Sequence, residues 1–303
     1  MRPTHVMTVM FTMATLATIV IAPLLAAQVF AQSAPMPRPD VEAPEGFRAN
    51  RTTYSTIMDV LAPTRVRVTD AHLERLEALQ LESLWIALGD YRGNYASGFR
   101  STQPGRLVGR AVTMRFLPPR PDVVRALDVL AAEGDWDRRY YARAAEEAGP
   151  GDVVVVDLGG TDGNQLFGDM GALGIKLTGA NGVIIDGGTR DLAELQGEAF
   201  DGFPVFARFF DIQVSRWFGV DYNAPIKVGN AIVLPGDVVV ADEGGVIFFP
   251  PEIIDEVLES AERNVALEDH ERELLIEGQH RFRDVYPLSP ALREEWERSR
   301  QRP

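Results

Sequence analysis

The chain has 303 residues, of which 46% are hydrophobic and 24% charged, a composition typical of a globular protein with one large domain or two small ones. Its net charge is −14 at pH 7, and no run of basic residues interrupts this acidic surplus, which argues against binding to nucleic acid or anionic lipid. The absence of cysteine excludes disulfides, thiolate metal sites and lipoprotein attachment.

Residues 1–31 have the features of a secretory signal peptide. Arg2 precedes an apolar stretch from Val6 to Leu25, and Val29 and Ala31 occupy the −3 and −1 positions of a small-residue cleavage site. The alternative is an uncleaved membrane anchor, since the stretch is almost long enough to span a bilayer, but Pro23 favours cleavage. We therefore expect an exported protein, periplasmic or secreted by a bacterium, with a net charge of −15 once Arg2 is removed.

The rest of the chain divides into three parts. Residues 32–50 are rich in proline and acids and predict a flexible linker. Residues 51–280 are expected to form the main domain, which starts with helical periodicity over 51–88 and a glycine- and tyrosine-containing loop at 89–99. Residues 281–303 predict a charged helical tail.

The middle of the chain has the pattern of an α/β protein. Residues 106–118 alternate like a strand, and a helix is expected to begin at Pro121. Two apolar runs, at 151–160 and 182–188, enclose a helical segment at 164–182, which predicts a βαβ unit with parallel strands. Short strands around 226–249 then predict a β-rich layer, followed by a long helix from Glu252 to about Glu277.

Several common catalytic classes find no support. The four histidines have no partner at metal-ligand spacing, so any metal must be held by oxygen atoms, which favours Mg²⁺ or Mn²⁺. There is no G-x-S-x-G, no phosphate-binding loop with its Lys-Ser/Thr pair, and no G-x-G-x-x-G after the first strand of the βαβ unit.

A cluster of acids follows the predicted strands of the βαβ unit. Ligands of open α/β sheets bind beyond the carboxyl ends of the strands. Five acids and one arginine are expected there: Asp157, Asp162, Asp169, Asp186, Arg190 and Asp191. Taken singly, each aspartate is more simply a capping residue, and Asp186 is interpreted as structural. Gly168 to Gly171 mark a helix start whose N–H groups can bind a carboxylate.

Three motifs together resemble the RraA-like / 4-hydroxy-4-methyl-2-oxoglutarate (HMG) aldolase family. They are G-x-x-G-x-x-x-D-G-x-x-R-D at 179–191, P-V-F at 204–206 and P-G-D-x-V-x-A-D-x-x-G-V at 235–246. The resemblance implies an α/β/β/α sandwich related to the swivelling phosphohistidine domain, assembled as a homotrimer or homohexamer with sites between subunits.

The resemblance also implies roles for individual residues. Arg190 would bind the keto oxygen of a small 2-oxo acid and stabilise the enolate, and Asp191 would hold a divalent metal ion, Mg²⁺ or Mn²⁺. The amides of Met170 and Gly171 would bind the substrate carboxylate beside Gly168, and Asp169 would orient a water that relays protons. A glutamate from a neighbouring subunit would complete the metal site: Glu268 is the first candidate and Glu271 the second, although a solvated helix face explains either equally well.

The predicted function is therefore a metal-dependent carbon–carbon lyase, an aldolase or decarboxylase. A metal ion and an arginine can neutralise the enolate left by C–C cleavage, whereas Lys176, expected in mid-helix, does not favour a Schiff base. The alternative is a non-catalytic binding or regulatory protein. A methyltransferase is not favoured, because no glycine-rich cofactor-binding motif follows the first strand of the βαβ unit. The family's Ser/Thr-x-x-Asp-Ala segment is replaced here by ESLWIALGDYRGN, so the substrate is expected to differ from the family's usual one. An exported protein would also not regulate a cytoplasmic ribonuclease, which argues against the regulatory role.

Overall fold

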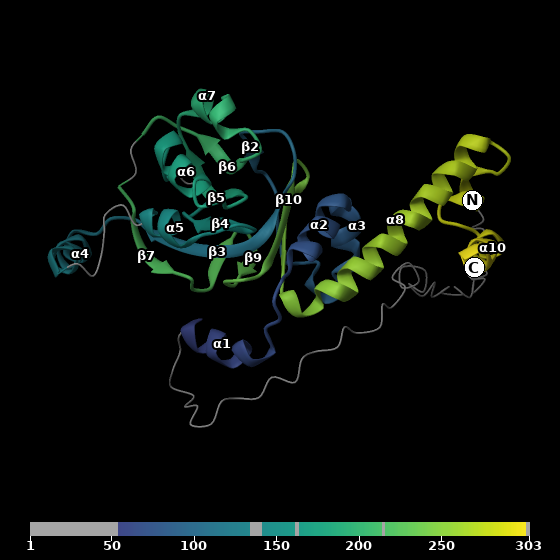
Figure 1. The fold of residues 1–303 in the computed structure, drawn as a ribbon, viewed down its shortest axis with the longest axis horizontal. Helices are drawn as coiled ribbons and strands as arrows, with labels where there is room; N and C mark the ends of the chain where they lie inside the picture. The colour runs from purple at the N-terminus through teal and green to yellow at the C-terminus, as the bar shows by residue number, and fades with distance from the viewer. Residues whose placement is uncertain (1–53, 134–140, 161–163, 214–215, 301–303) are drawn as a thin grey trace, which may run out of the picture. The chain divides into compact units, whose positions relative to one another are not determined.

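The computed structural model describes residues 54–133, 141–160, 164–213 and 216–300, so the expected signal peptide and linker lie outside the described residues. Within these ranges nine strands form one mixed sheet in the order β1-β11-β10-β3-β4-β5-β6-β2, and β7 pairs with the second half of β3 (Figure 1). The strands are β1 (Tyr95–Ala96), β2 (Arg100–Ser101), β3 (Leu107–Leu117), β4 (Asp152–Asp157), β5 (Gly182–Thr189), β6 (Val205–Phe210), β7 (Phe218–Tyr222), β10 (Val238–Asp242) and β11 (Gly245–Phe249).

The centre of the sheet is the predicted parallel unit. Strands β3, β4, β5 and β6 run parallel to one another, with Val154 opposite Val183 and Asp157 opposite Asp186. All residues of β5 and the four valines of β4 are buried, which explains why their sequences are apolar runs without alternation. The predicted βαβ unit is confirmed, because α6 (Asp169–Lys176) connects β4 to β5.

Helices cover one face of the parallel strands. α5 (Ala142–Glu147), α6 and α7 (Leu192–Leu195) lie over this face, whose core includes Val154, Val156 and Ile185 (Figure 1). α4 (Pro121–Glu133) begins at the predicted proline. Helix α6 is shorter than predicted: residues 164–168 are not helical, because Gln165 bridges Gly188 of β5 instead.

The opposite face packs against a second β layer. The hairpin β8 (Ile226–Val228) and β9 (Ala231–Val233) joins residues of β10 and β11 in a core with Val153 and Ile184. Outside this layer lie α2 (Asp70–Ala78), α3 (Leu81–Ala87) and α8 (Ile254–Glu277), with α3 in contact with both β10 and α8. The result is the α/β/β/α arrangement that the motifs implied, and the predicted β-rich layer is confirmed.

The N-terminal helical region is interrupted. Instead of one pattern over 51–88, the chain forms α1 (Tyr54–Leu61), a 3-10 turn η1 (Ala62–Thr64), an extended stretch, and then α2 and α3. A proline at the start of the turn stops α1, and Thr69 caps α2 by accepting a hydrogen bond from the His72 amide. A further 3-10 turn, η2 (Gly89–Tyr91), follows α3.

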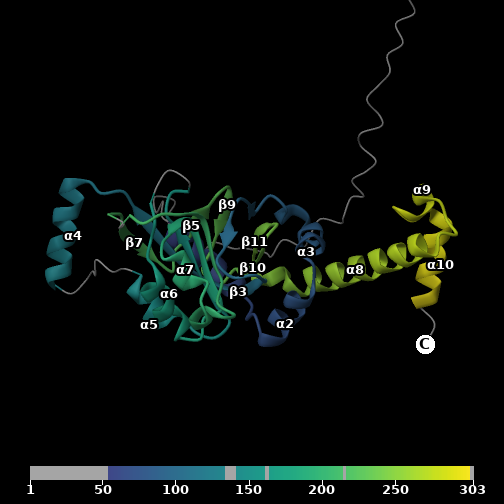
Figure 2. The ribbon, with the colours of Figure 1, turned by 90° about the horizontal axis from the view of Figure 1, so that it is seen from above.

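The C-terminal helices form a small cluster of their own (Figure 2). α8 starts after a 3-10 turn, η4 (Pro251–Ile253), and its second half packs with α9 (Phe282–Val285) and α10 (Pro290–Arg300). Trp296 of α10 is buried there with Val285 and Leu288. The first half of α8 is joined to α2 by an ion pair between Arg75 Nε and Glu262 Oε1 at 2.7 Å.

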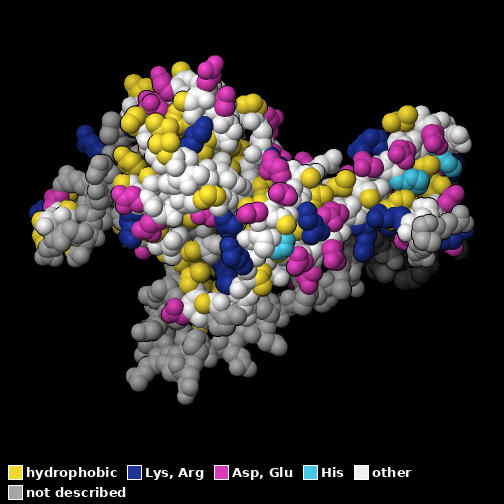
Figure 3. Space-filling model, in the orientation of Figure 1, with side chains coloured by type: hydrophobic (Ala, Val, Ile, Leu, Met, Phe, Trp, Pro, Cys, Tyr) yellow, Lys and Arg dark blue, Asp and Glu magenta, His cyan; other side chains and the backbone are white. Residues whose placement is uncertain are grey.

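Charged side chains of both signs are present on the face of the molecule seen in Figure 3. On the face shown in Figure 3, acidic, basic and hydrophobic side chains are interspersed. Across the described residues, no helix has the length and apolar character needed to cross a membrane.

Candidate active site

The end of β5 and the start of α6 bring the two predicted motifs together. Gly168 is the N-cap of α6, so the helix begins at Asp169, as the glycine-rich turn predicted. The Asp169 amide donates a hydrogen bond to Asp191 Oδ2 at 3.3 Å. Two segments separated by a helix and a strand in the sequence therefore share one hydrogen bond at the carboxyl edge of the sheet.

The carbonyl of Phe167 holds these two segments in register. It accepts hydrogen bonds from the Thr189 hydroxyl at 2.8 Å and from the Arg190 amide at 3.2 Å. Thr189 is fully buried at the end of β5. Neither Phe167 nor Thr189 was predicted as a site residue; the available signal was a hydroxyl side chain at the end of an otherwise apolar and glycine-containing strand.

Asp191 has an unusual backbone conformation. Its φ and ψ are 57° and 44°, the left-handed region that aspartate and asparagine tolerate better than most other side chains. Its carbonyl accepts the Leu195 amide at 2.9 Å, so α7 starts directly after it. The reversal turns the Asp191 side chain back towards the start of α6.

Gly168 is required by this close approach. A Cβ atom at position 168 would lie 1.6 Å from Asp191 Oδ2 and 3.0 Å from Cγ of Arg190. Only glycine leaves room for both side chains. A Cβ at Gly171 would likewise lie 2.7 Å from the Phe167 side chain.

Arg190 and Asp191 form an ion pair at the edge of the site. Arg190 Nε lies 3.3 Å from Asp191 Oδ2, and the two side chains are 32% and 34% exposed. Both can therefore reach a ligand from solvent. Arg190 contacts Asp191 through Nε. The guanidinium has further N–H groups at its two terminal nitrogens, which can donate to an oxygen of a bound ligand.

The first turn of α6 supplies further donors. The first amide bonded along the helix is that of Ala172, which donates to the Gly168 carbonyl. The amides of Met170 and Gly171 precede it in the first turn and therefore have no carbonyl partner within the helix. Such N–H groups, at the positive end of the helix dipole, suit a carboxylate. Met170 is 71% exposed, which keeps this end of the helix open.

The donor set of this chain fits a divalent ion that keeps most of its waters. The Asp191 carboxylate, which accepts the Asp169 amide, is partly exposed and offers oxygen atoms, the ligands that Mg²⁺ prefers. The described residues contain no group of three or more histidine, cysteine, aspartate or glutamate side chains that would form a complete cage. One or two carboxylates with several waters are sufficient for Mg²⁺.

The remaining acids of the predicted cluster are separated from this site. Asp186 is buried on the other face of the sheet, where it pairs with Arg208 Nε at 2.7 Å and accepts the Gly229 amide at 2.7 Å. Asp157 lies 3.4 Å from Arg115 Nε on the same side, and burial raises the pKa of its carboxyl. The structural interpretation of Asp186 agrees with these contacts, and Asp162 lies outside the described residues.

Lys176 is not in mid-helix, as the sequence suggested, but is the last residue of α6. Its ammonium group donates to the carbonyls of Ala199 at 2.7 Å and Asp201 at 3.1 Å. The helix therefore separates it from Asp169, and its donors hold the turn that follows α7.

The two candidate glutamates of α8 differ in their surroundings. Glu271 is buried, its Oε1 accepts the Leu288 amide at 3.1 Å, and burial raises its pKa. This contact gives Glu271 a structural role in the C-terminal cluster. Glu268 is half-buried on the same helix and stays a prediction as a ligand from a neighbouring subunit.

Fold and site together define an α/β/β/α protein with an arginine–aspartate pair beside a helix N-terminus. A model of the family RraA-like (Aldolase/RraA) matches residues 55–248, more than half of the chain. The chain therefore belongs to the RraA-like family.

Named relatives are similar over part of the chain. A protein of Halalkalibacterium halodurans, provisionally named 4-hydroxy-4-methyl-2-oxoglutarate aldolase, is 35% identical over 153 residues, which are 50% of this chain and 70% of that protein. A 4-hydroxy-4-methyl-2-oxoglutarate aldolase of Thermus thermophilus is 32% identical over 114 residues, 38% of this chain and 68% of the relative.

Solved structures show the same fold over more of the chain. Streptomyces coelicolor RraAS2, described as an unusual member of the RNase ES inhibitor RraA family, aligns with a TM-score of 0.57 and 27% identity over 68% of this chain and 99% of its own. An uncharacterised protein of Pseudomonas syringae aligns with a TM-score of 0.60 and 23% identity over 74% of this chain and 96% of its own.

Proposed function

We propose that this protein is a divalent-metal-dependent lyase that cleaves a carbon–carbon bond of a small 2-oxo acid. The observation that carries the proposal is the contact of the Arg190–Asp191 pair with the first residue of α6, through the Asp169 amide and Asp191 Oδ2. The aldolase names of the two relatives support the same reaction class. We also propose that the chain is exported and acts as a homotrimer or homohexamer.

The chain's own groups suit the two ends of such a substrate. The amides of Met170 and Gly171 bind the carboxylate, and the outer N–H groups of Arg190 bind the neighbouring keto oxygen. Because both sets of donors are fixed to one helix start and one strand end, the 2-oxo acid is held in one orientation.

Bond cleavage places negative charge on the keto oxygen. In oxaloacetate, the electrons of the bond to the leaving CO₂ pass to the 2-oxo group and give the enolate of pyruvate. In 4-hydroxy-4-methyl-2-oxoglutarate, a base removes the hydroxyl proton, one pyruvate leaves, and the other remains as the enolate. Arg190 stabilises this charge, and Asp169 orients the water that returns a proton to the enolate carbon.

Asp191 would hold the divalent ion, directly or through water, with Glu268 of a neighbouring subunit as a further ligand. When bound, the ion supplies a second positive charge that stabilises the enolate oxygen.

The test measures pyruvate from oxaloacetate or 4-hydroxy-4-methyl-2-oxoglutarate in the presence of Mg²⁺. We expect turnover by the wild type and loss of at least about 10³-fold in the Arg190→Ala, Asp191→Ala double variant, since both charged groups are removed. The matched control is Arg281→Ala, Asp284→Ala, which removes an ion pair of 2.6 Å between the N-cap residue of α9 and the helix itself. Equal rates for the double variant and the wild type would refute the proposal.

The alternative is a binding or regulatory protein that keeps the fold. The likeness to RraAS2, whose family is described by RNase ES inhibition, favours it. Stabilisation of the chain by 2-oxo acids in a thermal-shift assay, without pyruvate formation at any divalent-ion concentration, would support this alternative.

A further inference from the structure

A cavity with aromatic walls lies at the β1 end of the sheet, and β11, β10, β3 and β4 separate it from β5 in the strand order. Its volume is about 220 Å³, which suits a ligand of only a few heavy atoms. Residues of α3, β1, β11 and the turn between β10 and β11 line it. The part from α3 belongs to the segment ESLWIALGDYRGN, in which this chain departs from the family pattern.

Trp85 and Tyr95 form two walls of this cavity. Their ring centroids are 6.4 Å apart and the ring planes meet at 78°, so the two rings make a corner. Both side chains are accessible, since Trp85 is 38% and Tyr95 46% exposed. A corner of two aromatic rings presents π faces from two directions, and the negative face of an aromatic ring attracts a cation.

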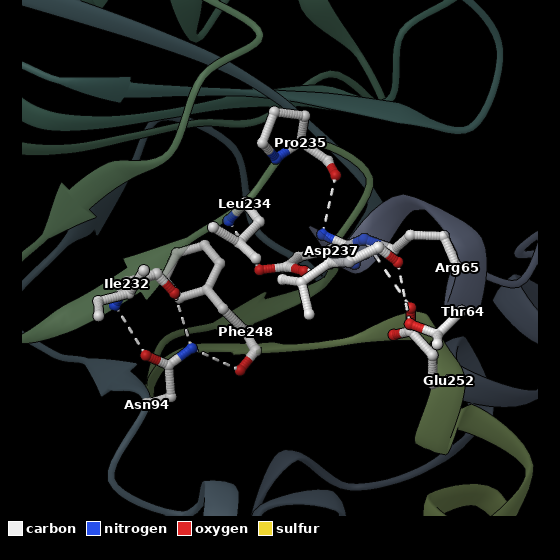
Figure 4. A network of polar contacts seen from close by, with 10 residues as sticks. Thr64, Arg65, Asn94, Ile232, Leu234, Pro235, Asp237, Phe248 and Glu252 are labelled. Carbon is white, nitrogen blue, oxygen red and sulfur yellow. Dashed lines mark hydrogen bonds and ion pairs between the residues drawn. The ribbon is translucent and has the colours of Figure 1, made fainter. Parts of the chain in front are cut away.

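Hydrogen bonds hold both rings in place. The indole N–H of Trp85 donates to the carbonyl of residue 92 at 2.9 Å. Tyr95 follows Asn94, whose Nδ2 donates to the carbonyls of Ile232 and Phe248 at 2.9 and 3.0 Å (Figure 4). The corner is therefore formed before a ligand arrives, which reduces the entropy lost on binding.

Glu82 adds a carboxylate to the same cavity. It is an exposed residue in the first turn of α3, and within the described residues its carboxylate has no hydrogen bond or ion pair. A Cβ atom added at Gly244 would lie 3.7 Å from Glu82 Oε1, so this carboxylate reaches the turn between β10 and β11 on the opposite wall. It is therefore accessible to a positively charged ligand.

The surrounding charges favour a cation over an anion. Three acids lie close together at this end of the fold, Glu77, Glu82 and Asp242, and their charges act on the half-buried Arg106. Arg92 lies over the indole ring, 5.7 Å from its centroid. Neither arginine lines the cavity, and three acids against two bases leave a negative surplus around it.

The cavity offers few acceptors for N–H groups. Apart from the Glu82 carboxylate and the Tyr95 hydroxyl, its side chains are apolar or aromatic, and they include Leu81, Val246 and Ile247. A primary ammonium group would leave part of its N–H donors without a partner there, which costs free energy. Methyl groups on the nitrogen instead pack against apolar and aromatic walls, so the composition favours a quaternary ammonium group.

We propose that this cavity binds the quaternary ammonium group of a small organic cation. The methyl groups of the cation contact the rings of Trp85 and Tyr95, and Glu82 supplies the opposite charge. The site is separate from the one at Arg190 and does not depend on the proposed lyase activity.

Calorimetric titration of the full chain at pH 7.5 with choline chloride tests the proposal. We expect saturable binding that is at least about tenfold tighter than for 3,3-dimethylbutan-1-ol, in which a carbon atom replaces the charged nitrogen, because the attraction to the rings and to the carboxylate is lost. Ethanolamine keeps the charge but has N–H groups in place of the methyl groups, and is expected to bind more weakly than choline.

Variants separate the aromatic corner from general charge effects. Tyr95→Leu removes a π face from an exposed position and is expected to weaken choline binding at least about threefold, whereas Tyr95→Phe keeps the ring and should bind like the wild type. Glu82→Gln should weaken binding at least about fivefold. Glu77→Gln removes an equal charge from an exposed side chain outside the cavity lining and should have little effect.

Each of three results would overturn the proposal: no saturable binding of choline at millimolar concentration, equal binding of the neutral alcohol, or unchanged affinity in Tyr95→Leu or Glu82→Gln. The second of these would mean that the cavity takes apolar groups without regard to charge. Arg190→Ala should bind choline like the wild type, so failure of this proposal is distinguishable from failure of the proposed lyase function.

Discussion

Gly168 lies so close to Asp191 that a Cβ atom added at position 168 would be 1.6 Å from Asp191 Oδ2. An alanine at position 168 therefore forces Asp191 out of its contact with the Asp169 amide. A displacement of about 1 Å in a catalytic group can reduce a rate by about 10²-fold, and we expect Gly168→Ala to lose pyruvate formation to this extent. Gly93→Ala, whose Cβ would meet nothing within 4 Å, is the matched control and should retain full activity.

The Thr189 hydroxyl supports the site through the Phe167 carbonyl. Thr189→Val keeps the shape but removes this hydrogen bond, so we expect the free energy of unfolding to fall by about 1 kcal/mol and the rate of pyruvate formation to fall several-fold. Thr113→Val is a close control. Thr113 lies on β3, is equally buried, and donates its hydroxyl hydrogen to the Ala224 carbonyl at 2.6 Å. It should lose similar stability in urea denaturation while its activity stays at the wild-type level.

Removal of divalent ions should affect activity more than stability. Asp169 and Asp191 are already held by a hydrogen bond and an ion pair within the chain, so the fold does not depend on an ion to bring them together. We expect a chelator to abolish pyruvate formation, Mg²⁺ or Mn²⁺ to restore it, and the melting temperature to change little. Asp191→Asn should require a higher Mg²⁺ concentration for half-maximal rate, and Asp284→Asn should not. Full activity after exhaustive chelation would contradict the metal dependence.

Asp237 should make the stability of the protein depend on pH. Burial raises its pKa from 3.8 to about 6, although the positive charge of Arg65 opposes the shift. Between these values the folded state binds a proton that the unfolded state has released, so stability falls as pH rises from 4 to 6 and then levels off. A shift of this size corresponds to about 3 kcal/mol.

The measurement compares urea denaturation of the wild type and Asp237→Asn at pH 4, 5, 6 and 7. Burial also raises the pKa values of Asp157 and Glu271, but these groups act equally in both proteins. The stability difference between wild type and variant should therefore fall by about 3 kcal/mol over this range. A difference that stays constant from pH 4 to 7 would show that the Asp237 carboxyl titrates normally.

Much of the architecture was predictable from the sequence because it depends on local periodicity. The valines of β4 and the apolar run of β5 indicate strands buried on both faces, and the helix between them requires a parallel crossover. The start of α6 at Gly168 follows from its glycine-rich turn. Boundaries that depend on long-range pairing were predicted less well: residues 164–168 leave the helical pattern because Gln165 bridges Gly188.

The sequence alone determined which residue types are present at the candidate site and that they follow a buried strand. Only the tertiary structure decided how the acids are divided. Side chains that alternate along a strand point to opposite faces of the sheet, so Asp186 pairs with Arg208 on one side while the turn after β5 directs Asp191 to Asp169 on the other.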